Sequence, residues 1–509
     1  MQAIGQLPSA QIKCLVLRAE RDVARCDGTP SCGTFTCRNA GNRRDICHLD
    51  PENPRVILDA VIRQARPPSP LAGRLSVQSL LFALGEGTFM TGSAVFFTQV
   101  VGLSAAQVGL GLTCAGIAAF LAALPMGKLV DRFGPKKMWA VSATGQAAMF
   151  AVWPFITDFQ GYVVMAVGME VIGALGGAAH GAYTIGVLPP DERVRSWAYM
   201  YSALNVGFTL GSLLGGFALA FDSNDVLHAL PWFTAVVFLV NATAISRLPR
   251  ASHDDRTPED RKVRVPGPGP LRNPGWLLTT FFGGVFWSNQ VLLNVVIPLW
   301  LVEATDAPRV LLAFLFGTNT VMCIFLPMAA ARGVDGVSTA LRAIRVSSTF
   351  FVISCLITLA THDTVGWVTI TLVWLGHVTV TGAELYLSAA SWTFEAELMD
   401  PRQRGAYQGA AGLSGTLGKV WAPAVYTFLA MNWGAGGWLV IAGIIVVATI
   451  GVHPSTRLAR RFLEKYVPAD VLADARASVP DPEDGFAVGP PSLITTDEPV
   501  PDPTPDPIR

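Results

Sequence analysis

Long apolar segments constrain this chain more than any other feature of its sequence. Twelve of them can be drawn between residues 75 and 453, and a helix needs about 20 apolar residues to cross the hydrocarbon core of a bilayer. Only 15% of the residues are charged, against about 25% in soluble domains. The sequence therefore predicts an all-α membrane protein with twelve transmembrane helices, and it excludes an ordinary soluble enzyme. The predicted spans are 75–98, 105–126, 138–157, 161–187, 197–220, 229–247, 276–302, 309–330, 344–361, 365–390, 405–430 and 434–453.

Basic residues are distributed unevenly between the connecting segments. The connections assigned to one face carry nearly all the Lys and Arg, beginning with Lys128 and Lys136, whereas those of the opposite face carry a single basic residue, Arg309. Positive residues collect on the cytoplasmic side of a membrane protein. We therefore expect both termini in the cytoplasm and an even number of spans.

A polar linker rich in Pro and Gly divides the spans into two sets of six. Residues 71–247 and 276–454 are predicted to form two six-helix bundles, joined by a cytoplasmic linker at 248–275. Residues 455–509 are expected to be a mostly disordered tail with a short surface helix near its start. Residues 1–70 are expected to be a disordered N-terminal extension. No Met lies between Met1 and Met90, so a native start near Val56 or Val61 is a hypothesis that N-terminal mass spectrometry would test.

Two short matches suggest that the two bundles are related by duplication. Pro190 and Arg193 recur as Pro401 and Arg404, 211 positions later. Asp131 is followed by Asp335 at a spacing of 204. Two parallel repeats with a site at their interface are a transporter architecture. We therefore expect two pseudo-symmetric bundles.

The segment after the second span carries a specific motif. It begins at Gly127 and reads GKLVDRFGPKK, with its fixed positions at Gly127, Asp131, Arg132, Gly134, Lys136 and Lys137. This resembles the signature of the major facilitator superfamily, with Pro135 in place of one basic residue. A carboxylate such as that of Asp131 is favoured at a helix N-terminus. The resemblance implies that this loop latches the cytoplasmic face in the outward-open state.

The fifth predicted span carries a second motif. Its glycines are Gly207, Gly211, Gly215 and Gly216. The pattern resembles the family's antiporter motif, with Ser212 in place of a proline. Small residues four apart allow another helix to pack closely, so a plain packing stripe is the alternative interpretation. The resemblance to bacterial drug:proton antiporters extends over residues 71–454.

Ionisable residues inside the spans are candidates for the transport site, because a charge at the bilayer centre is costly and faces a cavity or a partner. Glu86, Glu170 and Glu384 are the candidates for proton coupling, because a carboxyl removed from water holds its proton more strongly. A structural hydrogen bond is the alternative role. The resemblance places these residues and the candidate substrate residues His180 and His377 on helices that line a central cavity.

The seventh predicted span holds three amides near its middle. Asn289, Gln290 and Asn294 are candidate substrate-cavity residues, and Gln290 follows Glu86 by 204 positions. Interhelical hydrogen bonds are the alternative role. Phe89, Phe286, Trp287 and Trp374 are candidate aromatic walls for an apolar or cationic ligand.

The remaining features favour transport over other classes of function. The formal net charge is zero, which gives no indication of a nucleic-acid partner. No GxxxxGK[ST], HExxH or GxSxG motif occurs, and five N-terminal cysteines fit no zinc spacing. We expect no enzyme activity, no cofactor and no metal site. A membrane sensor or an enzyme acting within the lipid is the remaining alternative from a different class.

From the resemblance we expect a monomeric multidrug antiporter of a bacterial cytoplasmic membrane. It would export small amphipathic compounds by alternating access, with the proton gradient as its energy source. Proton-coupled uptake of a small nutrient or metabolite is the alternative, because the same fold supports both directions of transport.

Overall fold

The computed structural model describes residues 66–221, 223–250 and 267–475. These residues are almost entirely helical, and no strand occurs among them. Contacts divide the chain into Met1–Arg66 and Pro67–Arg509, and all the helices described here belong to the second unit. Most of the expected N-terminal extension, with the proposed start sites, lies outside the described residues. So do residues 251–266 of the expected linker and the expected tail beyond residue 475.

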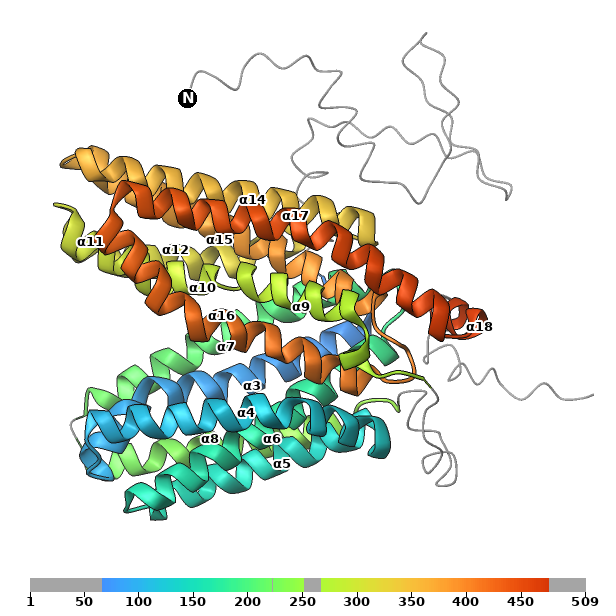
Figure 1. Cartoon of the computed structure of the whole chain (residues 1–509). Helices are drawn as coiled ribbons and strands as arrows, with labels where there is room; N and C mark the ends of the chain where they lie inside the picture. Colours follow the sequence, from blue (N-terminus) through green and yellow to red (C-terminus); the bar gives the residue numbers. More distant parts are fainter. Residues whose placement is uncertain (1–65, 222, 251–266, 476–509) are drawn as a thin grey trace, which may run out of the picture. The chain divides into compact units, whose positions relative to one another are not determined.

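The first set of helices is named here the N-terminal group (Figure 1). Its N-caps agree with the local sequence, because Ser104 forms a capping box with Gln107 and Asp158 accepts a hydrogen bond from the Gly161 amide at 2.7 Å. Its helices are α3 (Pro70–Val95, continued by the π-helical turn Phe96–Val100), α4 (Ala105–Phe133), α5 (Pro135–Val152), α6 (Phe159–Val187), α7 (Arg193–Leu219) and α8 (Asn224–Ser246).

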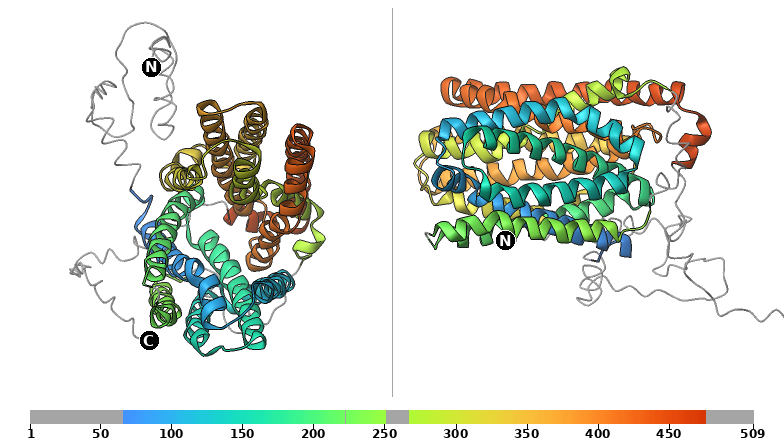
Figure 2. Two further views of the ribbon diagram at one scale, coloured as in Figure 1. Left: turned by 90° about the vertical axis from the view of Figure 1, so that its left-hand side faces the viewer. Right: turned by 90° about the horizontal axis from the view of Figure 1, so that it is seen from below.

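The second set is named here the C-terminal group, and its helices are more often interrupted. They are α9 (Pro274–Phe286), α10 (Asn289–Val291), the π-helical turn Leu292–Val296, α11 (Ile297–Ala304), α12 (Leu311–Phe325), α13 (Pro327–Ala330), α14 (Val337–Ala360), α15 (Trp367–Glu397), α16 (Arg404–Trp433), α17 (Ala435–Tyr466) and α18 (Ala469–Asp474). The view on the left of Figure 2 shows the long helices end-on and packed side by side.

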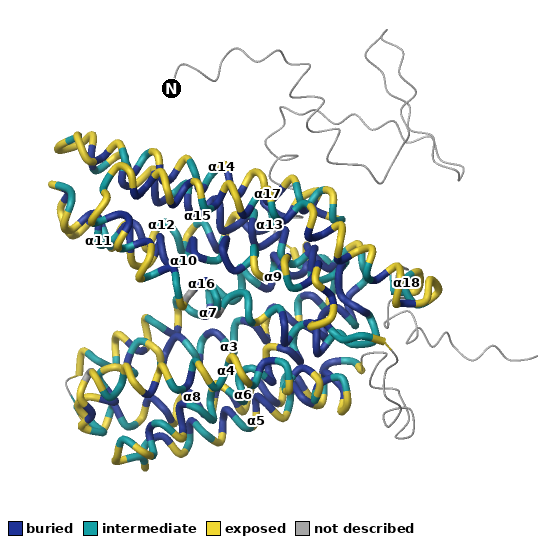
Figure 3. Tube along the Cα trace, in the orientation of Figure 1, coloured by how far each residue is buried: buried dark blue, intermediate teal, exposed yellow. Residues whose placement is uncertain are grey.

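Nine helices in the described part of the chain are long and apolar enough to cross a membrane. The predicted spans at 138–157, 309–330 and 405–430 fall on α5, α12 and α16, which are not among the nine. Large apolar side chains such as Leu121, Phe217 and Ile450 are exposed. Figure 3 shows exposed residues along the helices of both groups. A multi-pass membrane fold explains this exposure, while the number of twelve spans stays a prediction.

Two predicted spans differ from the observed helices. The seventh, predicted over 276–302, corresponds to one candidate span, Pro274–Ala304, but its helix is interrupted by a turn at Trp287 and Ser288, where the Ser288 hydroxyl is 3.0 Å from the Tyr426 hydroxyl. The last was predicted to end at residue 453, but α17 continues to Tyr466. Helix α17 continues through Pro454 without a break. One missing backbone N–H is tolerated when the flanking turns keep their hydrogen bonds. The expected surface helix is thus an extension of α17.

Helices α3 and α7 pack closely through the second sequence motif. A Cβ atom at Gly207 or Gly211 would lie 2.3 Å from the carbonyl oxygen of Leu80 or Leu84, and one at Gly215 would lie 2.5 Å from that of Thr88. No atom lies within 4 Å of the Cβ position of Gly216. Gly216 does not belong to this contact because it lies about 100° around the helix from Gly215.

Candidate functional site

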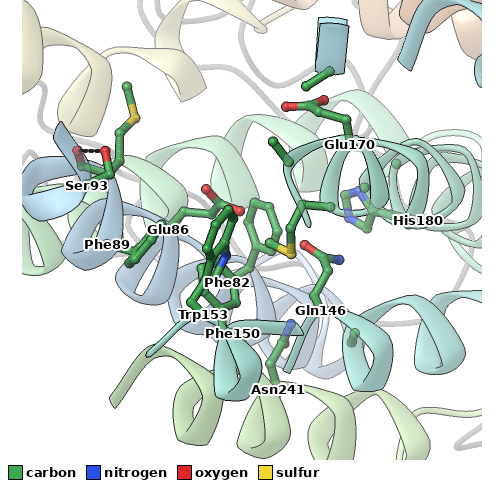
Figure 4. A pocket seen from close by; sticks show the side chains of 18 of the residues that line it. Phe82, Glu86, Phe89, Ser93, Gln146, Phe150, Trp153, Glu170, His180 and Asn241 are labelled. Atoms are coloured by element: carbon green, nitrogen blue, oxygen red, sulfur yellow. Dashed lines mark hydrogen bonds between the residues drawn. The ribbon is translucent and has the colours of Figure 1, made fainter. Parts of the chain in front are cut away.

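A cavity of about 570 Å³ lies within the N-terminal group. All six helices of that group contribute to its lining, as do residues such as Trp153 between α5 and α6. None of the lining residues comes from the C-terminal group. Figure 4 shows Glu86, Gln146, Asn241 and the aromatic rings around this space.

Aromatic rings form much of the cavity wall. Phe89 stands 5.1 Å from Phe150 between ring centroids, and Phe97 stands 4.9 Å from Trp153. Phe82 also lines the space. Such a wall offers apolar surface together with ring faces that attract a cation. Of the predicted aromatic residues, Phe89 lines this cavity, whereas Phe286, Trp287 and Trp374 do not.

Glu86 brings a carboxylate to the aromatic wall. It lies on α3 between Gly85 and Gly87, and a Cβ at either glycine would come within 2.8 Å of Phe238 or 2.6 Å of the Phe208 carbonyl. The two glycines thus let α7 and α8 approach on both sides of the turn that carries Glu86. Glu86 lines the cavity together with Phe82 and Trp153, all three of which are labelled in Figure 4.

Two further predicted residues, both on α6, line the same cavity. Glu170 is exposed and shares the lining of the cavity with Glu86. The His180 ring is 4.9 Å from the ring of Trp139 between centroids. The structure therefore brings together Glu86, Glu170 and His180.

A second polar centre surrounds Glu384 on α15 of the C-terminal group. Glu384 is buried, with 5% of the residue exposed. It accepts hydrogen bonds from the Tyr201 hydroxyl at 2.6 Å and from the Asn319 amide at 3.3 Å. The amide of Gln290 is a further hydrogen-bond partner. The partners shown by the structure are neutral, and Tyr201 comes from α7 of the other group.

The other predicted substrate residues do not line the cavity. Asn289 and His377 are fully buried; no hydrogen bond of the Asn289 side chain is found within the described part of the chain, whereas the His377 ring has the Leu315 backbone as a partner. Asn294 is exposed and donates a hydrogen bond to the Gln290 carbonyl at 2.8 Å. A substrate role for these three residues stays a prediction.

Three cavity amides were not singled out in the sequence. Gln78, Gln146 and Asn241 lie on α3, α5 and α8. Their signal in the sequence was an amide inside an apolar segment, which is the same signal that drew attention to Asn289 and Gln290. Helix packing, which decides the direction of each side chain, was needed to distinguish them.

Asp131 joins the two groups at one end of α4. Its carboxylate accepts hydrogen bonds from the backbone N–H groups of Gly405 at 2.7 Å and Ala406 at 2.8 Å, in the first turn of α16. A Cβ at Gly127 would lie 2.3 Å from the Gly405 carbonyl oxygen, so glycine permits this contact. Gly134 has a φ of 97°, a conformation that favours glycine, where the chain turns from α4 to α5.

The basic residues of the same motif have separate contacts. Lys136 donates a hydrogen bond to the carbonyl of Leu248 at the end of the N-terminal group. The Arg132 guanidinium lies 5.3 Å from the centroid of the Phe133 ring. Lys137 is exposed.

These features agree with the comparison to known families. The model of the Major Facilitator Superfamily matches residues 75–423. The chain belongs to the Major Facilitator Superfamily. It is therefore a multi-pass membrane transporter rather than an enzyme, and small molecules are the substrates that its family membership implies.

Bacterial multidrug resistance proteins are among its relatives in this superfamily. Multidrug resistance protein 1 of Bacillus subtilis is 26% identical over 166 residues, which cover 32% of this chain and 40% of that protein. Multidrug resistance protein MdtH of Yersinia enterocolitica is 24% identical over 376 residues, 72% of this chain and 86% of that protein. The match to the Bacillus protein thus spans less than half of that relative's length.

Solved structures share the fold. A bacterial homologue of the iron transporter ferroportin, in an outward-facing state with soaked iron, matches with a TM-score of 0.60 and 13% identity. The match covers 75% of this chain and 98% of that one. The helices of this chain are therefore arranged as in that solved structure.

Proposed function

We propose that this transporter exports small amphipathic cations in exchange for protons, across a bacterial cytoplasmic membrane. The observation that carries the proposal is the position of Glu86, a carboxylate on the aromatic wall of a 570 Å³ cavity. A cation bound there would gain from the carboxylate charge and from the ring faces together. The relatedness to bacterial multidrug resistance proteins supports the same class of substrate.

Competition for a carboxylate provides the link to protons. A proton and a cationic substrate cannot both neutralise Glu86, so protonation from one side of the membrane would release a substrate bound from the other side. Glu170 lines the same cavity and adds a second negative charge that attracts a cation. Glu384 is a second candidate proton site, because it is buried and its observed partners are neutral.

Alternating access would move the two helix groups relative to each other. Asp131 bonds the start of α16 at the end of the molecule where basic residues predict the cytoplasm. We propose that this contact closes the cytoplasmic side and opens when substrate enters from the cell.

The first experiment is accumulation of a fluorescent cationic dye in bacterial cells that lack their own multidrug pumps. Cells that express the protein should accumulate less dye, and a protonophore should abolish the difference. Expression of Glu86→Gln at equal membrane abundance should restore accumulation. Unchanged accumulation with the wild-type protein in the membrane would contradict export of such cations.

Proton-coupled uptake is the second candidate function. Ser212, which replaces the proline of the family's antiporter motif, is the observation that favours it. Proteoliposomes with an imposed pH gradient distinguish the two directions. Antiport moves the substrate against the direction of proton flow, whereas symport moves it along with the protons.

A further inference from the structure

Four polar atoms in the wall of the N-terminal cavity are buried without a hydrogen-bond partner in the described part of the chain. They are Gln78 Oε1, Asn241 Oδ1, Trp153 Nε1 and His180 Nε2. A buried polar atom that has lost its hydrogen bond costs roughly 1–3 kcal/mol. Their grouping around one cavity suggests that a ligand's polar atoms complete these bonds.

Gln78 and Asn241 are held firmly in place. Gln78 on α3 is 4% exposed, and Asn241 on α8 is 1% exposed. Helix α8 packs against α3, with Phe238 against the position of Gly85 and the Thr234 hydroxyl 3.5 Å from the Gly85 carbonyl. Both amides are therefore fixed on one side of the cavity by the contact between these two helices.

The third cavity amide behaves differently. Gln146 donates a hydrogen bond from its Nε2 to the Ser142 hydroxyl at 3.1 Å, and Ser142 in turn donates to the Ile172 carbonyl at 2.7 Å. These hydrogen bonds hold the Gln146 side chain against α5 and α6 in the cavity wall. An amide that faces this cavity can find a protein partner, so the unpaired oxygens of Gln78 and Asn241 are a specific feature of the α3–α8 side.

The available groups indicate which ligand would fit. Gln78 Oε1, Asn241 Oδ1 and the Glu86 carboxylate are all hydrogen-bond acceptors, whereas Trp153 Nε1 is a donor. The rings of Phe89 and Phe150 supply the apolar contact. A cation without N–H groups would satisfy the charge of Glu86 but would leave both amide oxygens buried and unpaired.

We infer that the cavity selects flat aromatic cations that carry N–H donors, and that Gln78 and Asn241 are the residues that bind those donors. The inference deepens the proposed function and rests on it. Specificity of this kind is effective because a ligand that lacks the donor leaves buried acceptors unsatisfied, a stronger penalty than loss of apolar contact.

Two acridine dyes provide a matched test. Proflavine and acridine orange share a cationic tricyclic ring with one ring N–H, but proflavine adds the N–H donors of two primary amines where acridine orange has two dimethylamino groups. Binding of each dye to the purified full-length protein is measured by fluorescence anisotropy. We expect wild-type protein to bind proflavine about a hundredfold more tightly, the effect of roughly one such hydrogen bond at each of the two amides.

The variants Gln78→Met and Asn241→Leu remove one acceptor each with little change in size. Each should weaken proflavine binding about tenfold and leave acridine orange binding unchanged or stronger. Ser196→Ala is the matched control, because the Ser196 hydroxyl is also buried without a hydrogen-bond partner in the described part of the chain but lies outside this cavity. It should leave the ratio of the two affinities as in the wild type.

The outcomes separate the inference from the proposed function. Equal affinities in the wild type, or a preference for proflavine that is undiminished in both variants, would overturn the role of the two amides. If both dyes are still exported from cells in a protonophore-sensitive manner, the proposed function stands even though the role of Gln78 and Asn241 does not. Absence of both binding and export for the two dyes would overturn both proposals.

Discussion

The Tyr201 hydroxyl donates a 2.6 Å hydrogen bond to the Glu384 carboxylate, and this bond connects α7 of the N-terminal group to α15 of the C-terminal group. Since α12 also packs on α7, the two groups meet on this side as well as at α4 and α16. A proton on Glu384 would weaken the bond by removing the negative charge that strengthens it. The pair therefore offers a place where protonation could affect the contact between the groups.

Replacement of Tyr201 by Phe tests this contact. Loss of a hydrogen bond to a charged group amounts to roughly 1.5–3 kcal/mol, so we expect proton-driven export to fall about tenfold, while dye binding in the N-terminal cavity stays unchanged. Transport in proteoliposomes and equilibrium binding measure the two quantities separately. Glu384→Gln should act on the same bond, so the double variant should be no worse than the poorer single variant. Additive losses would argue against a shared role.

Replacement of Glu86 by Gln should abolish energised export without preventing membrane insertion, because the side chain keeps its size and loses its charge. Affinity for a cationic dye should fall at least tenfold, since the variant loses the negative charge that attracts the ligand at the aromatic wall. Glu464→Gln is a suitable control, because Glu464 pairs with Arg460 on an exposed part of α17. Full export by Glu86→Gln would remove this residue from the mechanism.

Replacement of Asp131 by Asn should slow turnover several-fold with little change in dye binding. An Asn side chain has only one acceptor oxygen for the two N–H groups of Gly405 and Ala406. It also lacks the negative charge that interacts favourably with the N-terminus of α16. Asp335, its counterpart at the spacing of 204, is the control. It accepts a hydrogen bond from Thr339 within its own group, at 3.1 Å. An Asp335→Asn variant as slow as Asp131→Asn would count against a specific latch.

Replacement of Gly211 by Ala should destabilise the contact between α3 and α7. The new Cβ would lie 2.3 Å from the Leu84 carbonyl oxygen, which belongs to the backbone and cannot move aside cheaply. Overpacking of this kind costs roughly 1–3 kcal/mol. Thermal unfolding in detergent should begin at a lower temperature than for the wild type. Gly216→Ala, whose Cβ meets no atom within 4 Å, should be as stable as the parent or more so.

Much of the candidate site could be foreseen from single residues. Glu86, Glu170 and His180 stood out as ionisable side chains within apolar segments, and the structure places all three around one cavity. The same criterion also selected Glu384 and His377, which lie elsewhere. The physical reason is that hydropathy reports that a polar residue is inside a helix, but not the direction of its side chain relative to neighbouring helices.

By itself, the sequence determined that this chain is a helical membrane protein of the Major Facilitator Superfamily, because segment length, apolar composition and a local loop motif are properties of short stretches. Only the tertiary structure decided that the cavity lies within the N-terminal group, that Gln78 and Asn241 share its wall, and that Tyr201 reaches Glu384 183 positions away. These relationships depend on the rotation of each helix about its axis and on the contacts that glycines such as Gly207 permit. Rotation and contact arise from packing between distant segments, which no local pattern specifies.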